Sequence, residues 1–157
     1  MDMWEPDIQA TLAKVPEAAE KIVFDRFHVR GHVGKAVDTV RKPEHRELMA
    51  SGDETLKGRK YLWLYSRENV PDRRREECAA RMRQELKVGR AWAIKEALRR
   101  RWHYVYPASG WKFWKRWYFW ATHSRLEPIR QAAETVRRHI DNILTYYQHP
   151  VTNAMSE

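Results

Sequence analysis

The amino-acid sequence predicts a mainly α-helical protein with a small α/β part at its amino end. Apolar residues recur at helical spacing from Val29 almost to the end of the chain. Proline and glycine divide this region into segments of helical length. Only one run, residues 22–24, clearly has the β-branched and aromatic composition of a buried strand.

The amino-terminal elements are a short helix and this strand. The helix is expected over residues 6–14, which open with a proline and place Ile8 and Leu12 on one face. Pro16 ends it. The strand that follows ends in an acid, Asp25.

The middle of the chain is expected to form helices separated by one polar loop. Helical periodicity begins at Val29 and is expected to break at Pro43. The polar stretch 51–60 predicts a loop. A strongly charged helix then begins at Pro71, and we expect it to end near Gly89, because glycine disfavours the interior of a helix.

Two helices rich in large side chains are expected next, with a turn over residues 107–110 between them. The first is expected to place five residues along one face: Ala91, Trp92, Lys95, Leu98 and Trp102. The second carries a mainly aromatic stripe at helical spacing: Trp111, Trp114, Trp117, Tyr118 and Ala121.

The last predicted helix is the most regular, and Pro128 stands near its start. Its apolar face consists of Ile129, Ala132, Ala133, Val136, Ile140, Ile143, Leu144 and Tyr147. Its polar face consists of Arg130, Glu134, Arg137, Arg138 and Asp141.

Length and charge narrow the classes of partner. A chain of 157 residues fits one domain or a part of a larger protein. Lys and Arg number 30 against 21 Asp and Glu, which gives a net charge of +9 and a pI near 9.8. An excess of this size favours an acidic polymer, DNA or RNA, as the partner. The alternative is a basic protein with no such partner.

Other features exclude several classes. The single cysteine, Cys78, rules out a disulfide within the chain and a cysteine-based zinc site, so we expect a reducing, cytoplasmic location. The first ten residues carry three acids and lack the apolar core of a signal peptide. No run of about 18 apolar residues predicts a transmembrane helix. Glycine-rich nucleotide loops, the nucleophile elbow and the H-E-x-x-H zinc motif are also missing from the sequence.

Clusters of basic side chains are candidates for binding phosphates. One cluster is Arg73, Arg74 and Arg75; the two that we assign to nucleic-acid binding are Arg99, Arg100 and Arg101, and Lys112, Lys115 and Arg116. Aromatic residues interleave with the last cluster, and aromatic rings can stack on exposed bases. The alternative for this cluster is a solvated helix face opposite a packed aromatic one.

An acid and a histidine follow the predicted strand. Asp25 stands at its end and His28 lies three residues later. Residues just beyond a strand's carboxyl end face the ligand crevice of open α/β sheets, so this pair could take part in metal or proton chemistry. The alternative is that Asp25 caps a helix and His28 lies in its first turn. Asp2 and Glu157, near the two ends of the sequence, are unremarkable taken singly.

Several sequence blocks together resemble the transposases of the ISL-three family of insertion sequences. The blocks are MDMWEP, KIVFDRFHV, AVDTVRKPEHREL, KYLWL with ENVP, and TNAMSE. Their order and spacing agree with the family over essentially the whole chain. Either the D-R-F-H-V block or the T-N-A-x-S-E block would be weak alone, but together they are specific.

The resemblance implies a fold and a set of site residues. The expected fold is a helical insertion domain, residues 30–148, attached to a small α/β remnant of a ribonuclease H-like catalytic core, residues 1–29. Residues 149–157 are expected to begin the helix of the catalytic glutamate. By motif, Asp2 matches the second catalytic aspartate and Glu157 the glutamate, while Asp25 and His28 match a D-x-x-H signature. A second alignment makes Asp25 itself the second catalytic acid.

The resemblance also implies an activity, which is metal-dependent cleavage and joining of DNA strands during transposition. Asp2 and Glu157 would hold Mg²⁺, and the partners would be transposon ends and target DNA, with a homo-oligomer expected for the full-length family protein. The first catalytic aspartate and the family's DNA-binding regions are expected upstream of Met1, so we expect the chain to be inactive alone. The alternatives are a non-catalytic basic helical module that binds nucleic acid and a helical protein-interaction domain.

Overall fold

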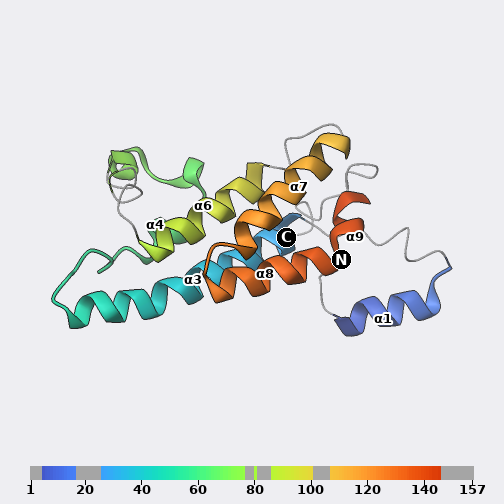
Figure 1. Cartoon of the computed structure of the whole chain (residues 1–157), viewed down its shortest axis with the longest axis horizontal. Helices are drawn as coiled ribbons and strands as arrows, with labels where there is room; N and C mark the ends of the chain where they lie inside the picture. Colours follow the sequence, from blue (N-terminus) through green and yellow to red (C-terminus); the bar gives the residue numbers. More distant parts are fainter. Residues whose placement is uncertain (1–4, 17–25, 77–79, 81–85, 101–106, 146–157) are drawn as a thin grey trace.

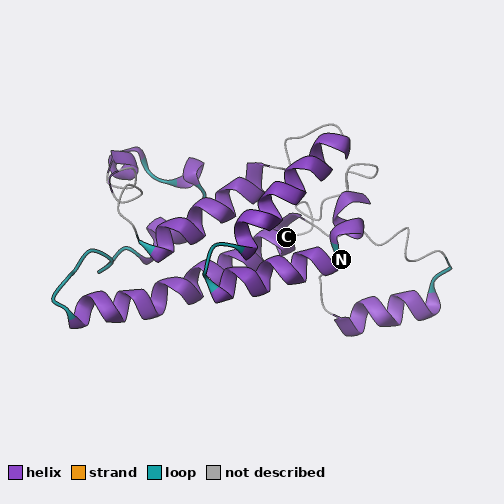
Figure 2. Cartoon of the chain, viewed as in Figure 1, coloured by secondary structure: helices purple, strands orange, loops and turns teal. Residues whose placement is uncertain are grey.

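A computed structural model describes residues 5–16, 26–76, 80, 86–100 and 107–145. Within these ranges the chain forms helices joined by turns and loops, and it contains no strand (Figures 1 and 2). This confirms the prediction of a mainly α fold. The predicted strand over 22–24 lies outside the described residues, as do thirteen of the 29 residues of the predicted ribonuclease H-like remnant, so both stay predictions.

The long helix α3 (Arg26–Ala50) is the centre of the fold. It packs against α6 (Lys87–Arg100) and α8 (Glu127–Arg138), and also against the short helix α4 (Lys60–Leu64). The contact face of α3 is buried along a row of residues three or four positions apart: Val29, Val33, Val37, Val40 and Glu44. In Figure 1, α3 runs along the group of packed helices, and α1 (Glu5–Lys14) stands apart from them.

The predicted break at Pro43 is wrong, because α3 continues through this residue to Ala50. A proline inside a helix removes one backbone hydrogen bond and costs about 3 kcal/mol. Here Pro43 lies on the exposed side, while the buried row continues past it from Val40 to Glu44. Packing of that row against neighbouring helices offsets the local cost.

The elements on either side of α3 partly match the sequence prediction. Helix α1 has the predicted extent, and of its described side chains only Ile8 is buried. The loop predicted over 51–60 is present as turns up to Arg59, and it inserts one fully buried side chain, Leu56, into the core. Two single-turn 3₁₀ helices follow α4, η1 (Arg67–Asn69) and η2 (Asp72–Arg74). Most of the charged helix predicted after Pro71 lies outside the described residues.

A break between helices lies at Leu86, near Gly89 as predicted, but α6 starts at Lys87 and includes the glycine itself. The reason is a cap supplied by another helix. The carboxylate of Glu44 on α3 accepts hydrogen bonds from the backbone amides of Lys87 and Val88, both at 2.7 Å. A carboxylate at this position satisfies free amides of the first turn and favours the positive end of the helix dipole. The helix therefore starts at Lys87, two residues before the glycine.

Helix α7 (Pro107–Thr122) begins where a turn was predicted over 107–110, and that prediction is also wrong. A proline in the first turn lacks only an amide that has no helical partner there, and its fixed backbone angle suits a helix. Proline followed by small residues is therefore compatible with a helix start as well as with a turn. Helix α7 packs against α6, α8 and α9 (Ile140–Thr145).

The last predicted helix is divided at His139 into α8 and α9. Its predicted apolar face is buried at every position whose side chain is described, namely Ile129, Ala132, Ala133, Val136, Ile140 and Ile143. The five predicted polar-face residues are all exposed. The side chain of Leu144, and Tyr147 and Trp102 as a whole, lie outside what is described. No helix in the described ranges is long and apolar enough to cross a membrane.

Candidate nucleic-acid interface

Helix α7 has one packed aromatic face. Trp114, Trp117 and Ala121 are buried, and the Trp114 ring stacks against that of Trp117 with centroids 5.2 Å apart. The indole N–H of Trp117 donates a hydrogen bond of 2.8 Å to the carbonyl oxygen of Ile94 on α6. These rings are part of the core and are not available to bases. The packed-face interpretation of the aromatic stripe is confirmed for them, whereas Trp111 of the same stripe is exposed.

The opposite side of α7, which we call the α7 outer face, combines cations with exposed rings. It consists of Trp111, Lys112, Lys115, Arg116, Phe119, Trp120 and, just beyond the helix, His123. Helix α7 contains no Asp or Glu. Within the described part of the chain, Lys112 and Arg116 have no ion pair or hydrogen bond through their side chains. All three cations predicted in this segment therefore face solvent, with no acid of their own helix to neutralise them.

Neighbouring side chains hold the exposed rings of this face. The ammonium of Lys115 lies 5.6 Å from the centroid of the Trp111 ring, within the range of a cation–π contact. The rings of Phe119 and His123 stack with centroids 3.9 Å apart. Nδ1 of His123 lies 2.8 Å from the carbonyl oxygen of Phe119, so in this arrangement Nδ1 carries the proton and donates it. Trp111, Lys115, Phe119 and His123 thus form a row with a spacing of four residues.

A hollow of about 380 Å³ opens beside this row, between α7 and the α8–α9 segment. Its lining includes Phe119 and Trp111, with Lys115 and Arg137 as cations. One wall is fixed by Tyr118, whose hydroxyl donates to Glu134 and accepts a hydrogen bond of 3.2 Å from Arg137. Partial burial and the bond to Glu134 raise the pKa of Tyr118.

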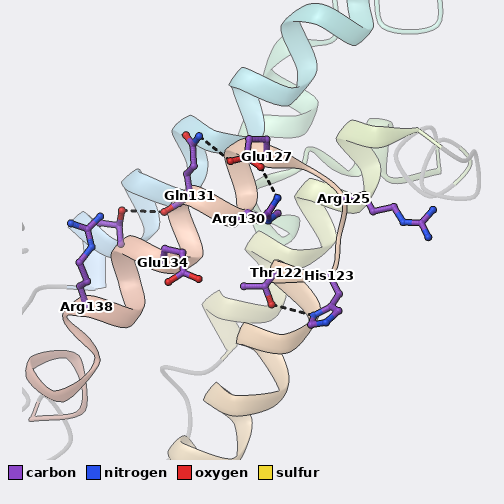
Figure 3. A pocket seen from close by; sticks show the side chains of 9 residues that line it. Thr122, His123, Arg125, Glu127, Arg130, Gln131, Glu134 and Arg138 are labelled. Carbon is purple, nitrogen blue, oxygen red and sulfur yellow. Dashed lines mark hydrogen bonds and ion pairs between the residues drawn. The ribbon is translucent and has the colours of Figure 1, made fainter.

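A larger hollow of about 710 Å³ lies at the end of α7 against the outer side of α8 (Figure 3). Its charges are mixed and partly paired. Glu127 forms an ion pair with Arg130 at 2.9 Å and accepts a hydrogen bond of 3.2 Å from Gln131. Arg125 extends away from the side chains of α8 in this view. The paired acids make this hollow a weaker candidate for an anionic partner than the α7 outer face.

The second predicted cluster, Arg99 to Arg101, has a different environment. The side chain of Arg99 is 14% exposed; its guanidinium contacts Glu96 at 3.2 Å and also forms an ion pair with Glu68. Burial works to lower the pKa of Arg99, but the two carboxylates outweigh it and raise the pKa. Arg99 is therefore engaged within the fold. The side chain of Arg100 and the whole of Arg101 are not described. In the first cluster, Arg75 pairs with Asp72 at 2.9 Å.

Lys95 shows a second way in which α6 uses a cation internally. Its ammonium is buried and donates hydrogen bonds of 3.0 to 3.2 Å to the carbonyl oxygens of Trp63, Leu64 and Tyr65. These carbonyls belong to the end of α4, where helical partners are missing and the dipole favours a positive charge. The sequence pattern placed Lys95 on the packed face but gave no sign of this partner.

The predicted catalytic residues lie almost entirely outside the described residues. Asp2, Asp25 and Glu157 fall in ranges that the structure does not describe. His28 lies in the first turn of α3, as the helix-cap interpretation requires, but its side chain is not described. In the described ranges no group of three or more His, Cys, Asp or Glu residues could hold a metal ion. The assignment of these four residues therefore stays a prediction.

Sequence reasoning missed Phe119, Trp120 and His123 as members of the exposed face. A signal for them was present, because residues 112, 115, 116 and 119 follow helical spacing on the side opposite Trp114, Trp117 and Ala121. Helical spacing alone places Phe119 and Trp120 off the buried stripe. The number of exposed aromatic residues on α7, and their position between the cations, distinguish this helix from an ordinary solvated one.

Comparisons with known proteins place the chain in a class. A family described as transposases matches residues 1–157, the whole sequence. The chain belongs to this family, the DDE transposases of the ISL-three (ISL3) type, as the sequence blocks indicated.

One curated relative supports the same assignment. The chain is 28% identical over 161 residues to the transposase for insertion sequence element IS1001 of Bordetella parapertussis. The match covers 98% of this chain but 37% of the relative, so the chain spans little more than a third of that protein's length. No solved structure matches the chain.

Proposed function

We propose that this chain is the part of an insertion-sequence transposase that holds DNA on a helical domain and contributes acids to the site that cuts and joins DNA strands. The family match over residues 1–157 supports the overall role. The observation that carries the DNA-holding role is the α7 outer face, with its exposed cations and no acid on the helix.

The cations of α7 are well placed to follow a phosphate backbone. Lys112, Lys115 and Arg116 lie three and four residues apart, so they share one side of the helix. Each phosphate that such a side chain neutralises releases condensed counterions, and this release drives binding that weakens as salt is added. Contacts of this kind position DNA without reading its sequence. We expect this segment to hold DNA non-specifically, with sequence recognition supplied elsewhere.

Chemistry at the strand to be cut is assigned, by motif, to residues near the two ends of the chain. Asp2 and Glu157 would hold Mg²⁺, a hard cation that prefers carboxylate oxygens and that, when bound, favours in-line attack of water or a 3′-hydroxyl on a phosphodiester. Asp25 remains an alternative to Asp2 as the second acid. His28 would position substrate or water beside them.

The DNA-binding proposal is tested by removing the same charge from two different places. In one variant Lys112, Lys115 and Arg116 are all changed to Gln. In the control, three exposed cations outside the candidate clusters, Lys14, Lys35 and Arg46, are changed to Gln. Affinity for a short duplex is measured by fluorescence anisotropy as a function of salt. We expect the α7 variant to lose affinity and to reduce the log–log salt slope by about 0.9 for each phosphate contact removed.

The control variant should keep most of the affinity and nearly all of the salt slope. Equal losses in the two variants would show that DNA responds to net charge alone, and would overturn the assignment to α7. Absence of duplex binding by the unmodified chain at low salt would overturn the DNA-holding role itself.

A second test concerns catalysis by a polypeptide of these 157 residues alone. By motif it contains two of the three acids that the family uses, and losing a direct metal ligand should be more severe than the roughly 10- to 100-fold loss seen for residues that only support ligands. We expect no nicking of a supercoiled plasmid carrying related transposon ends, with Mg²⁺ or Mn²⁺. Metal-dependent nicking that disappears in Glu157→Gln would contradict this expectation.

A further inference from the structure

The α7 outer face exposes far more aromatic surface than phosphate binding requires. Phe119 is 62% exposed, Trp120 44% and Trp111 40%. Isolated exposed rings are common, but a group of them on one face marks a surface that contacts something. The partner must tolerate the cations among these rings, because Lys112, Lys115 and Arg116 lie on the same side.

The hollow of about 380 Å³ beside Phe119 is at the small end of the range for ligand sites, which is roughly 300 to 1,000 Å³. A space of this size suits a single flat group better than a helix or a strand of another protein. Rings of Trp111 and Phe119 and the side chain of Ile140 supply apolar surface, and Lys115 supplies positive charge. Arg137 adds a second cation, which also contacts Glu134 at 3.7 Å. No acidic residue is among the residues that line it. A flat aromatic group joined to an anion, such as a nucleotide, matches this lining.

The rings are held before any ligand arrives. Phe119 is supported from one side by the stacked ring of His123, whose Nδ1 is tied to the carbonyl of Phe119. Trp111 is paired with the ammonium of Lys115. Side chains that are already ordered lose little freedom when a ligand stacks on them, which strengthens binding.

We propose that this hollow receives one unpaired base of the DNA held by the α7 outer face, with the base stacked on Phe119 and its phosphate near Lys115 and Arg137. The proposal rests on the proposed function, because it assumes that this face holds DNA. A base inside a duplex has both faces covered by its neighbours, whereas an unpaired base offers one to a protein ring. The hollow therefore selects DNA in which a base has left the stack.

A second copy of the chain is the competing occupant, and charge argues against it. In a two-fold symmetric contact the same surface meets itself, so Lys112, Lys115 and Arg116 would face their own counterparts. Helix α7 has no acid to relieve that repulsion. DNA with an unpaired base offers both the negative charge and the flat ring that this face requires. A second copy of this basic chain offers only apolar surface.

The test compares two DNA duplexes that differ only in one bulged, unpaired base. Binding of the whole chain to each is measured by fluorescence anisotropy at one salt concentration. We expect tighter binding to the bulged duplex. In Phe119→Ala the ratio of the two affinities should fall by about 5- to 150-fold, the effect of one stacked base. Affinity for the fully paired duplex should stay within about twofold, because the phosphate contacts remain.

Two further variants control for folding and for exposed aromatic surface. Tyr61→Ala removes a large exposed ring of α4, outside both the α7 outer face and the hollow, and it should leave the preference intact. Phe119→Tyr retains a stacking ring and should keep the preference. Unchanged melting by circular dichroism in each variant shows that the fold is intact.

Each other outcome overturns a specific statement. Duplex binding without any preference for the bulge would overturn this inference and leave the proposed function in place. Absence of binding to either DNA would overturn both. A change of oligomeric state in Phe119→Ala, seen by light scattering with the preference unchanged, would show that a second copy occupies the face.

Discussion

Helices α6 and α7 are both rich in lysine and arginine, but the fold uses their cations in opposite ways. On α6, Lys95 is buried against backbone carbonyls and Arg99 is held between two carboxylates. On α7, Lys112, Lys115 and Arg116 face solvent on a helix without acids. The same residue types therefore stabilise the fold in one place and leave an uncompensated positive surface in the other.

The difference follows from what each helix packs against. Helix α6 lies against α3 and α4, and the segment after α4 presents free carbonyls and acids such as Glu68 to it. The outer side of α7 has no such neighbour among the described residues. A basic cluster thus becomes a binding surface only where no carboxylate or carbonyl of the fold pairs with its cations. Variants of α6 and α7 should therefore differ in their effects on stability and on DNA binding.

The largest expected difference in stability is between variants of two lysines, Lys95 on α6 and Lys112 on α7. Lys95→Met leaves the carbonyls of Trp63 and Leu64 without this donor, while the carbonyl of Tyr65 keeps the indole N–H of Trp92 at 3.1 Å, so the change should lower the free energy of unfolding by about 3 kcal/mol. Lys112→Met removes the same charge from α7 and should change stability by less than about 0.5 kcal/mol. Urea unfolding of both variants measures the difference. Equal destabilisation would show that the two helices do not differ as described.

The second-largest expected loss of stability comes from removing the carboxylate that caps α6. Glu44→Ala removes a carboxylate that accepts two backbone amides, and should lower the free energy of unfolding by about 2 kcal/mol. Glu47→Ala is a matched control from the same helix. Glu47 pairs with Lys87 at 3.1 Å, but its side chain is 63% exposed, so its loss should cost less than about 1 kcal/mol. A larger loss for Glu47→Ala in urea unfolding would contradict the assignment of the cap.

Two arginines separate stability from DNA binding. Arg99→Gln should lower the free energy of unfolding by about 1.5 kcal/mol, because it leaves the buried Glu96 with only the longer contact to Lys95 at 3.8 Å as a charged partner. It should leave the salt dependence of DNA binding unchanged. Arg116→Gln should do the reverse, reducing the salt slope by about 0.9 while stability is retained. The two measurements are urea unfolding and anisotropy against salt. A reduced slope in Arg99→Gln would place α6 on the DNA as well.

The smallest expected effect concerns a third set of cations, on α3. Burial works to raise the pKa of Asp38, but hydrogen bonds and charges from Arg41 and Lys42 outweigh it and hold the pKa below 3.8. A lowered pKa contributes stability that is present above pH 3.8 and is lost as the pH falls through the lowered value. Asp38→Asn should therefore cost less than about 1 kcal/mol at neutral pH.

This small cost should shrink as the pH falls below 3.8 and the carboxyl of the unmodified chain becomes protonated. Urea unfolding of Asp38→Asn and the unmodified chain at neutral pH and near pH 2 measures it. A difference that persists unchanged in acid would mean that Asp38 acts through packing and not through its charge.

Periodicity predicted most of the fold, and local rules failed where packing opposed them. The spacing of apolar residues correctly assigned the faces of α8 and α9 to core and solvent. Pro43 and Gly89 were expected to end helices, but contacts across the fold decide both positions, through the buried row of α3 and the cap from Glu44. The helices α6 and α8 that cover the buried row, and the glutamate that caps α6, are distant in sequence from the positions that they affect, so a local pattern could not reveal them.

The candidate nucleic-acid interface likewise has features that helical spacing predicts and features that depend on distant contacts. Exposure of Lys112, Lys115 and Arg116 follows from helical spacing alone. The pairing of Arg99 with Glu68 does not, because the two residues are thirty-one positions apart. The catalytic assignment of Asp2, Asp25, His28 and Glu157 depends on motif resemblance, and the described part of the fold leaves it as a prediction.

The two hydrogen bonds from Glu44 also bear on how the molecule opens. First-turn amides of a helix normally exchange with solvent quickly, because the end frays without disturbing the rest. Here the amides of Lys87 and Val88 can be released only when α6 parts from α3, so their deuterium exchange should be as slow as that of amides deep in the core. Lys95 joins the end of α4 to the same helix. Helices α3, α4 and α6 should therefore open together as one cooperative unit. Local unfolding at the start of α6 is suppressed by the contact from α3.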